Sequence, residues 1–226
     1  MPLKAGGNEP PWRLVLDGQF RLETGYERAA FVAPLPPAEV QADGHRWRVQ
    51  SPEGPLRADV LRRTCTDSMS GMPHPYTVIL YRAGRSLAGC GGEPAALLRG
   101  LDAPVEWVVE DIDGAGLADG ARVSLQFGAD GRVAGRSACN RYSAAYTLDG
   151  ERLAIRAGAG TRMACAPALM QLESRFLAAL AAVQGFALTA DGALELRGAG
   201  GRSMRARAMV PLAPRTPGVP GSQGGS

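Results

Sequence analysis

The sequence predicts a mainly β protein with α+β character: two small antiparallel, barrel-like domains in tandem, the second with one packed α-helix. Segments in which apolar residues fall on every second position recur along the chain, and Asp-Gly pairs that favour tight hairpins separate several of them. Only one stretch, at 167–183, has the apolar spacing of a helix. The four cysteines fall as one pair in each half. We therefore expect domains at 1–98 and 99–212 and a disordered, Gly/Pro/Ser-rich tail at 213–226.

The first half is predicted to be all-β. Trp12, Leu14 and Leu16 occupy alternate positions, which indicates a strand that ends at Asp17-Gly18. Further short strands are expected at 26–32, 47–50, 56–61, 76–81 and 86–90. None of these segments has helical periodicity.

A Pro-containing connector at 93–104 leads into the second half. Strands are expected there at 105–112, 123–127, 132–134, 146–148, 152–156, 186–189, 193–196 and 204–209. Three Asp-Gly pairs lie between neighbouring strands and predict tight turns: Asp130-Gly131, Asp149-Gly150 and Asp191-Gly192.

The single predicted helix begins at Pro167, because the first helical turn tolerates a residue without an N–H group. Its apolar residues at steps of three or four are Leu169, Leu172, Phe176, Leu180 and Val183. Gly185 is expected to end it.

The cysteines permit three disulfide connectivities. One bond per half, Cys65–Cys90 and Cys139–Cys165, is the simplest, and each would contribute roughly 3 kcal/mol on the chain-entropy model. The alternative is four reduced, buried thiols in a cytosolic protein. A zinc site is not expected, because paired ligand spacing is absent and the histidines are only His45 and His74.

The charge balance argues against a nucleic-acid partner. The formal net charge is only +3, and the basic residues are not concentrated in either half. No apolar run approaches the ~20 residues of a membrane span. The N-terminal residues are not expected to form a signal peptide, so we expect Met1 to be either an expression start after a removed leader or a genuine cytoplasmic start.

The second half carries several short motifs that occur together. They are the run Gly135–Tyr142 (GRSACNRY), Thr161-x-Met163-x-Cys165, Leu169-Met170, Glu173 and Phe176-Leu177. Together they resemble the META domain of HslJ-like bacterial proteins over roughly 101–212. The resemblance implies an antiparallel, barrel-like sheet with one packed helix, and no established enzymatic activity. Many members have Gly just before the cysteine where this chain has Ala138, which affects the local turn.

The first half resembles an uncharacterised bacterial envelope domain that often precedes META domains. The similarity covers roughly 5–95 and rests on Gly7–Trp12, Cys65–Gly71 and Gly89–Gly92. Such domains have an aromatic residue where this chain has Pro11. This resemblance implies no chemistry.

Asp67, Ser68, Ser70 and His74 lie close in sequence, which suggests a serine hydrolase as one hypothesis. No Gly-x-Ser-x-Gly nucleophile elbow accompanies them. The favoured interpretation is a polar turn beside a disulfide, in which Asp67 and Ser70 bond to backbone amides.

Asn140, Arg141 and Tyr142 form a second candidate ligand surface. The favoured interpretation is again structural: Asn140 bridges the turn through side-chain-to-backbone bonds, and Tyr142 packs on the helix. Thr161 is expected in a polar turn and Met163 beside the helix. The tryptophans are expected to be core residues.

These observations favour a non-enzymatic cell-envelope protein or lipoprotein, periplasmic or associated with the outer membrane, that binds an unknown protein or small molecule. No catalytic, metal or cofactor residue is assigned, and any membrane attachment would use an N-terminal lipid anchor outside this chain. The META resemblance implies a role in envelope stress or in tolerance of the antibiotic novobiocin.

Three alternatives stay open. The first is an inhibitor or interaction module against a secreted hydrolase such as lysozyme, which would present a rigid loop at 67–74 with Ser70 at its tip. The second is a hydrolase that uses Ser70 and His74. The third is a carrier of small apolar ligands, which would need an unfilled cavity inside the barrel.

Overall fold

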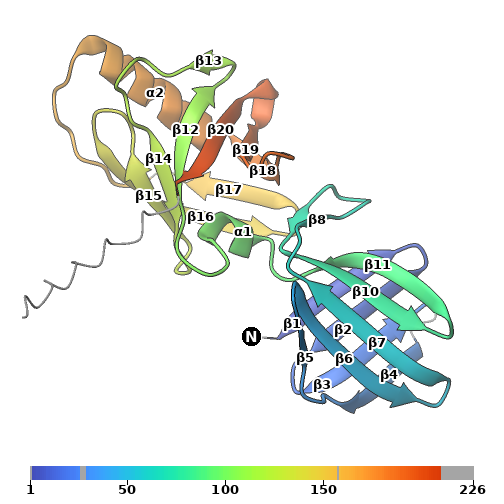
Figure 1. Cartoon of the computed structure of the whole chain (residues 1–226). Coiled ribbons are helices and arrows are strands. Elements are labelled where there is room, and N and C mark those ends of the chain that lie inside the picture. The colour runs from blue at the N-terminus through green and yellow to red at the C-terminus, as the bar shows by residue number, and fades with distance from the viewer. Residues whose placement is uncertain (1, 26–28, 157, 210–226) are drawn as a thin grey trace, which may run out of the picture.

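The computed structural model describes residues 2–25, 29–156 and 158–209, and most of them lie in antiparallel strands (Figure 1). The strands form one large sheet in each half of the chain and a small ribbon between them. The mainly β, two-sheet architecture predicted from the sequence is confirmed. The predicted tail lies outside the described residues.

The sheet of the first half curls around one apolar core as a half-barrel. Its strand order is β4-β3-β2-β1-β11-β10-β7-β6-β5. The bounds are β1 Leu3–Asn8, β2 Pro11–Leu16, β3 Gln19–Thr24, β4 Ala29–Pro34, β5 Glu39–Gln41, β6 Gly44–Ser51, β7 Gly54–Leu61, β10 Tyr76–Arg82 and β11 Arg85–Gly91. The alternation read in β2 holds: Trp12, Leu14 and Leu16 are buried and Arg13 is exposed.

A short ribbon leaves this sheet between β7 and β10. Strands β8 (Cys65–Thr66) and β9 (Pro73–His74) pair with each other, and the disulfide Cys65–Cys90 ties them to β11. The connector that follows contains the short helix α1 (Ala95–Arg99), which the sequence did not predict. A helix of five residues is too short to show periodicity, and packing of buried Leu97 and Leu98 stabilises it instead.

The sheet of the second half is a nearly closed barrel, because its end strands β17 and β18 lie side by side. The order is β17-β16-β15-β14-β12-β20-β19-β18, and β13 pairs with β12. The bounds are β12 Glu106–Ile112, β13 Ala115–Gly116, β14 Ser124–Phe127, β15 Arg132–Arg136, β16 Arg141–Asp149, β17 Arg152–Arg156, β18 Val183–Leu188, β19 Leu194–Gly198 and β20 Ser203–Met209, with a 3₁₀ turn at Ala199–Gly201.

Helix α2 (Pro167–Ala181) packs on this barrel through Leu172, Phe176 and Leu180. Its start at Pro167 agrees with the sequence prediction, but the predicted end at Gly185 is wrong. The amide of Ala182 closes the last turn on the carbonyls of Ala179 and Leu180, and β18 begins at the next residue. The sequence placed Val183 in the helix because it follows Leu180 at helical spacing. In the structure Val183 belongs to β18, and its side chain enters the same core as Leu180.

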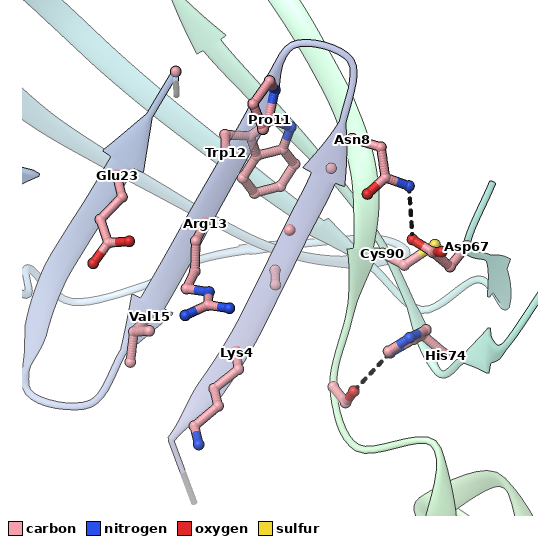
Figure 2. Close-up of a pocket in the computed structure, with 15 residues that line it drawn as sticks. Lys4, Asn8, Pro11, Trp12, Arg13, Val15, Glu23, Asp67, His74 and Cys90 are labelled. Carbon is pink, nitrogen blue, oxygen red and sulfur yellow. Dashed lines mark hydrogen bonds between the residues drawn. The ribbon is translucent and has the colours of Figure 1, made fainter. Parts of the chain in front are cut away.

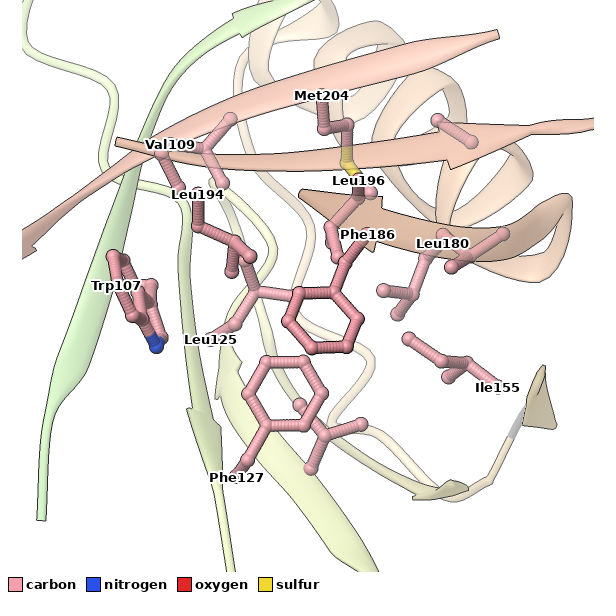
Figure 3. Packing of buried hydrophobic residues seen from close by; sticks show 14 of the residues in the cluster. Trp107, Val109, Leu125, Phe127, Ile155, Leu180, Phe186, Leu194, Leu196 and Met204 are labelled. Carbon is pink, nitrogen blue, oxygen red and sulfur yellow. The ribbon is translucent and has the colours of Figure 1, made fainter. Parts of the chain in front are cut away.

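The barrel interior is filled by side chains (Figure 3). Phe127, Leu125 and Phe186 meet in its centre, and Leu194, Leu196 and Met204 cover them from the neighbouring strands. An apolar ligand would find no room among these described residues, so the packing does not favour the carrier alternative. None of the helices in the described part of the chain has the length and hydropathy of a membrane span.

The two halves meet at the ribbon and α1. Met72, which lies between β8 and β9, is buried in the core of the second half together with Leu97 and Leu98. The indole of Trp107 donates a hydrogen bond to the carbonyl of Leu98 at 2.8 Å. Arg62 and Asp102 form an ion pair across the connector.

Candidate binding site

A groove of about 630 Å³ runs over the outer face of β1 and β2, beside the ribbon (Figure 2). Register pairing puts Gly6 between Arg13 of β2 and Cys90 of β11, so the floor has no side chain at its centre. Lys4 and Arg13 line one part of the groove, and Asp67 and His74 line the opposite wall. A groove with a backbone floor and charged walls suits a polar ligand or a protein loop.

The disulfide Cys65–Cys90 fixes this wall. Its Cα atoms are 5.3 Å apart, and Cys90 lies directly opposite Gly6 in the sheet. The ribbon is therefore covalently held at the edge of the groove. Both disulfides predicted from the cysteine spacing are present, since Cys139–Cys165 also forms.

Asp67 organises the turn between β8 and β9. Its Oδ1 accepts hydrogen bonds from the amides of Met69 and Ser70 and from the Ser70 hydroxyl, at 3.1, 2.8 and 2.8 Å. Its Oδ2 accepts from the Asn8 amide group at 3.0 Å. Desolvation raises the pKa of Asp67, but these hydrogen bonds outweigh it and lower the pKa to about 2. The polar turn expected from the sequence is therefore confirmed.

Ser70 and His74 have other partners than each other. The Ser70 hydroxyl donates to Asp67 and accepts from the Met72 amide, and the His74 Nδ1 lies 3.0 Å from the Gly92 carbonyl. The nucleophile–base hydrogen bond that the hydrolase hypothesis needs is thus not formed between these two described side chains.

The tip of the loop is Met69, not Ser70. The Met69 side chain is 81% exposed, whereas Ser70 is half-buried against Asp67. The inhibitor alternative would place Ser70 at the tip, but the Ser70 hydroxyl turns inward and completes the hydrogen bonds of Asp67.

Asn140 joins three segments of the second half. Its Oδ1 accepts from the Thr161 hydroxyl at 2.7 Å and from the Met163 amide at 2.8 Å. Its Nδ2 donates to the carboxylate of Glu173 on α2 at 3.1 and 3.3 Å. The side chain is buried, so each bond replaces one to water. The structural interpretation of Asn140 is borne out by these contacts.

Tyr142 packs on the helix, as the sequence suggested. Its ring meets Phe176 edge-on with centroids 5.2 Å apart, and its hydroxyl donates to the Ser124 carbonyl at 3.1 Å. Burial raises the pKa of this hydroxyl, so it stays protonated. Arg141 is exposed, and both residues line a second cavity of about 260 Å³.

Met163 does not pack beside the helix, and this prediction is wrong. Its side chain is 58% exposed. The residue is fixed by the hydrogen bond from its backbone amide to Asn140 Oδ1, and not by burial of the side chain. Ala138, where many META domains have Gly, adopts a φ of 79°. The turn before Cys139 therefore needs the left-handed conformation that glycine adopts most easily.

Sequence reasoning missed the groove's own charged residues, Lys4, Arg13 and Glu23. Arg13 and Glu23 could have been found from the sequence, because they alternate with the buried apolar residues of β2 and β3 and must face outward. Residues 65–74 gave no sign of which strand they would cover. Within the described ranges, no group of three or more His, Cys, Asp or Glu side chains could hold a metal ion.

The second half of the chain matches the model of a known family. Residues 101–209 match the family model described as "META domain". Residues 101–209 are a META domain. The Asn140 hydrogen bonds, Tyr142 and the strained Ala138 turn therefore all belong to the META domain, whereas the groove and its ribbon lie N-terminal to it.

Two solved structures are similar to part of the chain. One is an NMR structure of a protein from Burkholderia xenovorans, 28% identical, with a TM-score of 0.41, which covers 52% of this chain and 88% of that one. The other is an NMR structure with 26% identity and a TM-score of 0.39, covering 51% of this chain and 94% of the other. No curated protein matches the chain.

Proposed function

We propose that this protein is a non-enzymatic binding protein of the bacterial cell envelope, in which the groove on β1 and β2 receives a protein or small-molecule partner. The observation that supports this most is the disulfide Cys65–Cys90, which holds one wall of the groove in place. Disulfides persist in oxidising compartments, and a rigid wall binds with little loss of conformational entropy.

The use of the polar groups also favours binding over catalysis. Asp67, Ser70 and His74 each have a structural partner, either within the ribbon or at Gly92, the residue after β11. Lys4 and Arg13, by contrast, form no ion pair with any described residue, so their charges remain available to a partner.

The compartment is tested by fractionating cells that carry the native gene and mapping peptides without reductant. We expect the protein in the periplasmic or outer-membrane fraction, with both disulfides formed. If the protein were found in the soluble cytosolic fraction with four free thiols, the assignment to the envelope would be wrong.

Within the cell envelope, the role that we propose is tolerance of stress. A deletion strain should grow less well than wild type under heat or novobiocin. The wild-type gene should restore growth, whereas Arg13→Glu should not, because it reverses a charge in the groove. The matched control is Arg85→Glu, an exposed arginine of β11 outside the groove. Equal rescue by both variants would argue that the groove has no part in this role.

A second candidate function is an interaction module against a secreted hydrolase such as lysozyme. It is favoured by the loop at 67–72, whose tip residue Met69 is exposed on a hydrogen-bonded turn next to a disulfide. Met69→Asp should abolish inhibition of lysozyme, whereas Val40→Asp, at an exposed apolar residue of β5 outside the loop, should not. Lysozyme that keeps full activity with excess wild-type protein would eliminate this candidate.

A further inference from the structure

The META domain contains a second cavity, of about 260 Å³, between α2 and the loop at 158–162. The loop runs beside β16 almost as an added strand. The amide of Ser143 donates to the Ala159 carbonyl at 2.9 Å, and the amide of Thr161 donates to the Arg141 carbonyl at 3.0 Å. Gly158 permits this approach, since a Cβ there would lie 2.0 Å from the Ser143 carbonyl oxygen. The loop is thus held against the sheet, and space remains between it and the helix.

The floor of the cavity is apolar. The residues that form it come from β16, β17 and α2: Tyr142, Ala144, Ile155, Leu177, Leu180 and Ala181. Leu177 is 39% exposed, although it is a large apolar side chain on a helix whose other face is buried. An aliphatic group placed here would cover Leu177 and gain contact with the floor.

Two of the three charged residues that line the cavity are basic. Arg141 and Arg162 line it, and the third charged residue of the lining is Glu173. The Glu173 carboxylate accepts both of its described hydrogen bonds from the Asn140 amide group. Neither arginine has an ion-pair partner among the described residues, and the lining as a whole carries a formal charge of +1. Guanidinium groups at an apolar cavity favour a carboxylate.

The volume limits the size of the ligand. At about 30 Å³ for each water-sized group, the cavity holds roughly nine non-hydrogen atoms. This is the size of a short aliphatic acid.

We propose that the META domain binds a small monocarboxylate with a short aliphatic chain. The chain lies between α2 and the loop at 158–162, and Arg141 and Arg162 bind the carboxylate. This site is separate from the groove on β1 and β2, and it does not depend on the function proposed for that groove.

The experiment is a titration of the full-length, oxidised protein with hexanoate, followed by amide chemical shifts. We expect saturable shifts at 141–144, 158–162 and 173–181, with a Kd of about 1 mM for a ligand of this size. Hexanol, which lacks the charge, should bind at least about 10-fold more weakly, because it cannot form charge-assisted bonds to the arginines.

Two pairs of variants complete the test. Ala181→Phe fills the cavity and should abolish the shifts. Ala178→Phe, at an exposed position of α2 outside the cavity lining, should leave them unchanged. Arg162→Gln should weaken hexanoate about 10-fold, and Arg152→Gln, an exposed arginine of β17 outside the cavity, should have no effect. Because Arg162 is exposed, its variant tests the site even if Ala181→Phe fails to fold. Equal affinity for hexanol, or shifts that survive Ala181→Phe in a folded protein, would overturn the proposal.

Discussion

Asp67 is a carboxylate whose charge is part of the fold. Hydrogen bonds from Ser70, Asn8 and Met69 favour its ionised form over its protonated form. Its folded pKa of about 2 lies below the value of about 3.9 expected in an unfolded chain. The resulting stabilisation is present above about pH 4 and is lost as the pH falls through about 2.

We predict that Asp67→Asn removes the part of the pH dependence of the free energy of unfolding that comes from Asp67. Asparagine keeps an oxygen that can accept from the Ser70 and Met69 amides but carries no charge to titrate. Urea unfolding at a series of pH values should show that the variant is less stable than wild type at pH 6 and that the gap narrows between pH 4 and 2. Asp130→Asn, in an exposed hairpin turn, serves as the control. A gap that stays constant over this range would contradict the assigned pKa.

Ala138 is a second residue whose conformation has an energetic consequence. Its φ of 79° lies in the region that disfavours any side chain with a Cβ. We predict that Ala138→Gly stabilises the protein by about 0.5–1 kcal/mol, because relief of strain exceeds the entropy that glycine adds to the unfolded chain. Thermal unfolding measures the difference.

The control for Ala138 is Ala145→Gly, at an exposed position inside β16. It should destabilise by about 0.5–1 kcal/mol, because glycine in a regular strand only adds unfolded-state entropy. If both substitutions shift the melting temperature in the same direction, strain at Ala138 is not the cause.

At the scale of elements, Asn140 connects the β15–β16 hairpin, the loop before α2 and α2 itself. We predict that Asn140→Ala lowers the free energy of unfolding by about 2–4 kcal/mol, because it leaves several part-buried donors and acceptors without partners. Glu173→Gln should cost less than about 1 kcal/mol, since an amide oxygen still accepts from Asn140. Chemical denaturation compares the two; a larger loss in Glu173→Gln would mean that charge, and not this hydrogen bonding, holds the helix.

The elements that the sequence predicts well are those specified locally. Asp149-Gly150 joins β16 and β17, where Gly150 has a φ of 56°, and Pro167 starts α2. Strand β3 was not predicted, although Phe20 and Leu22 alternate with polar residues, because two apolar positions give too little periodicity. Helix α1 has the same difficulty, since tertiary packing and not local sequence specifies it.

The candidate site also has one part that nearby residues specify and one part that depends on residues far apart in the sequence. The polar turn around Asp67 is local, because Ser70 is only three residues away, and the sequence predicted it. The groove is not local: Asn8 and Asp67 are 59 residues apart, and their contact depends on where the ribbon folds back onto β1. No local pattern around Asn8 or Asp67 predicts this contact. Only the disulfide between Cys65 and Cys90 restricts where the ribbon can lie.

At the scale of the whole molecule, the ribbon touches both halves. Asn8 and Cys90 hold it to the first sheet, and Met72 is buried in the core of the second half. Figure 1 shows β8 between the two sheets. The wall of the groove and the junction with the META domain are therefore parts of one disulfide-anchored segment.

This arrangement predicts that Met72 restrains the motion of the two halves relative to each other. Met72→Ser removes an apolar side chain that is only 6% exposed, with a loss of roughly 1.5–3 kcal/mol of burial at the junction. Nitrogen-15 relaxation of the wild type should give similar rotational correlation times for both halves, and the variant should give different times for each. Met69→Ser, in the same loop but 81% exposed, should behave as the wild type does. Matching correlation times in Met72→Ser would mean that the connector at 93–104, through the Trp107–Leu98 hydrogen bond and the Arg62–Asp102 ion pair, holds the halves together without the ribbon.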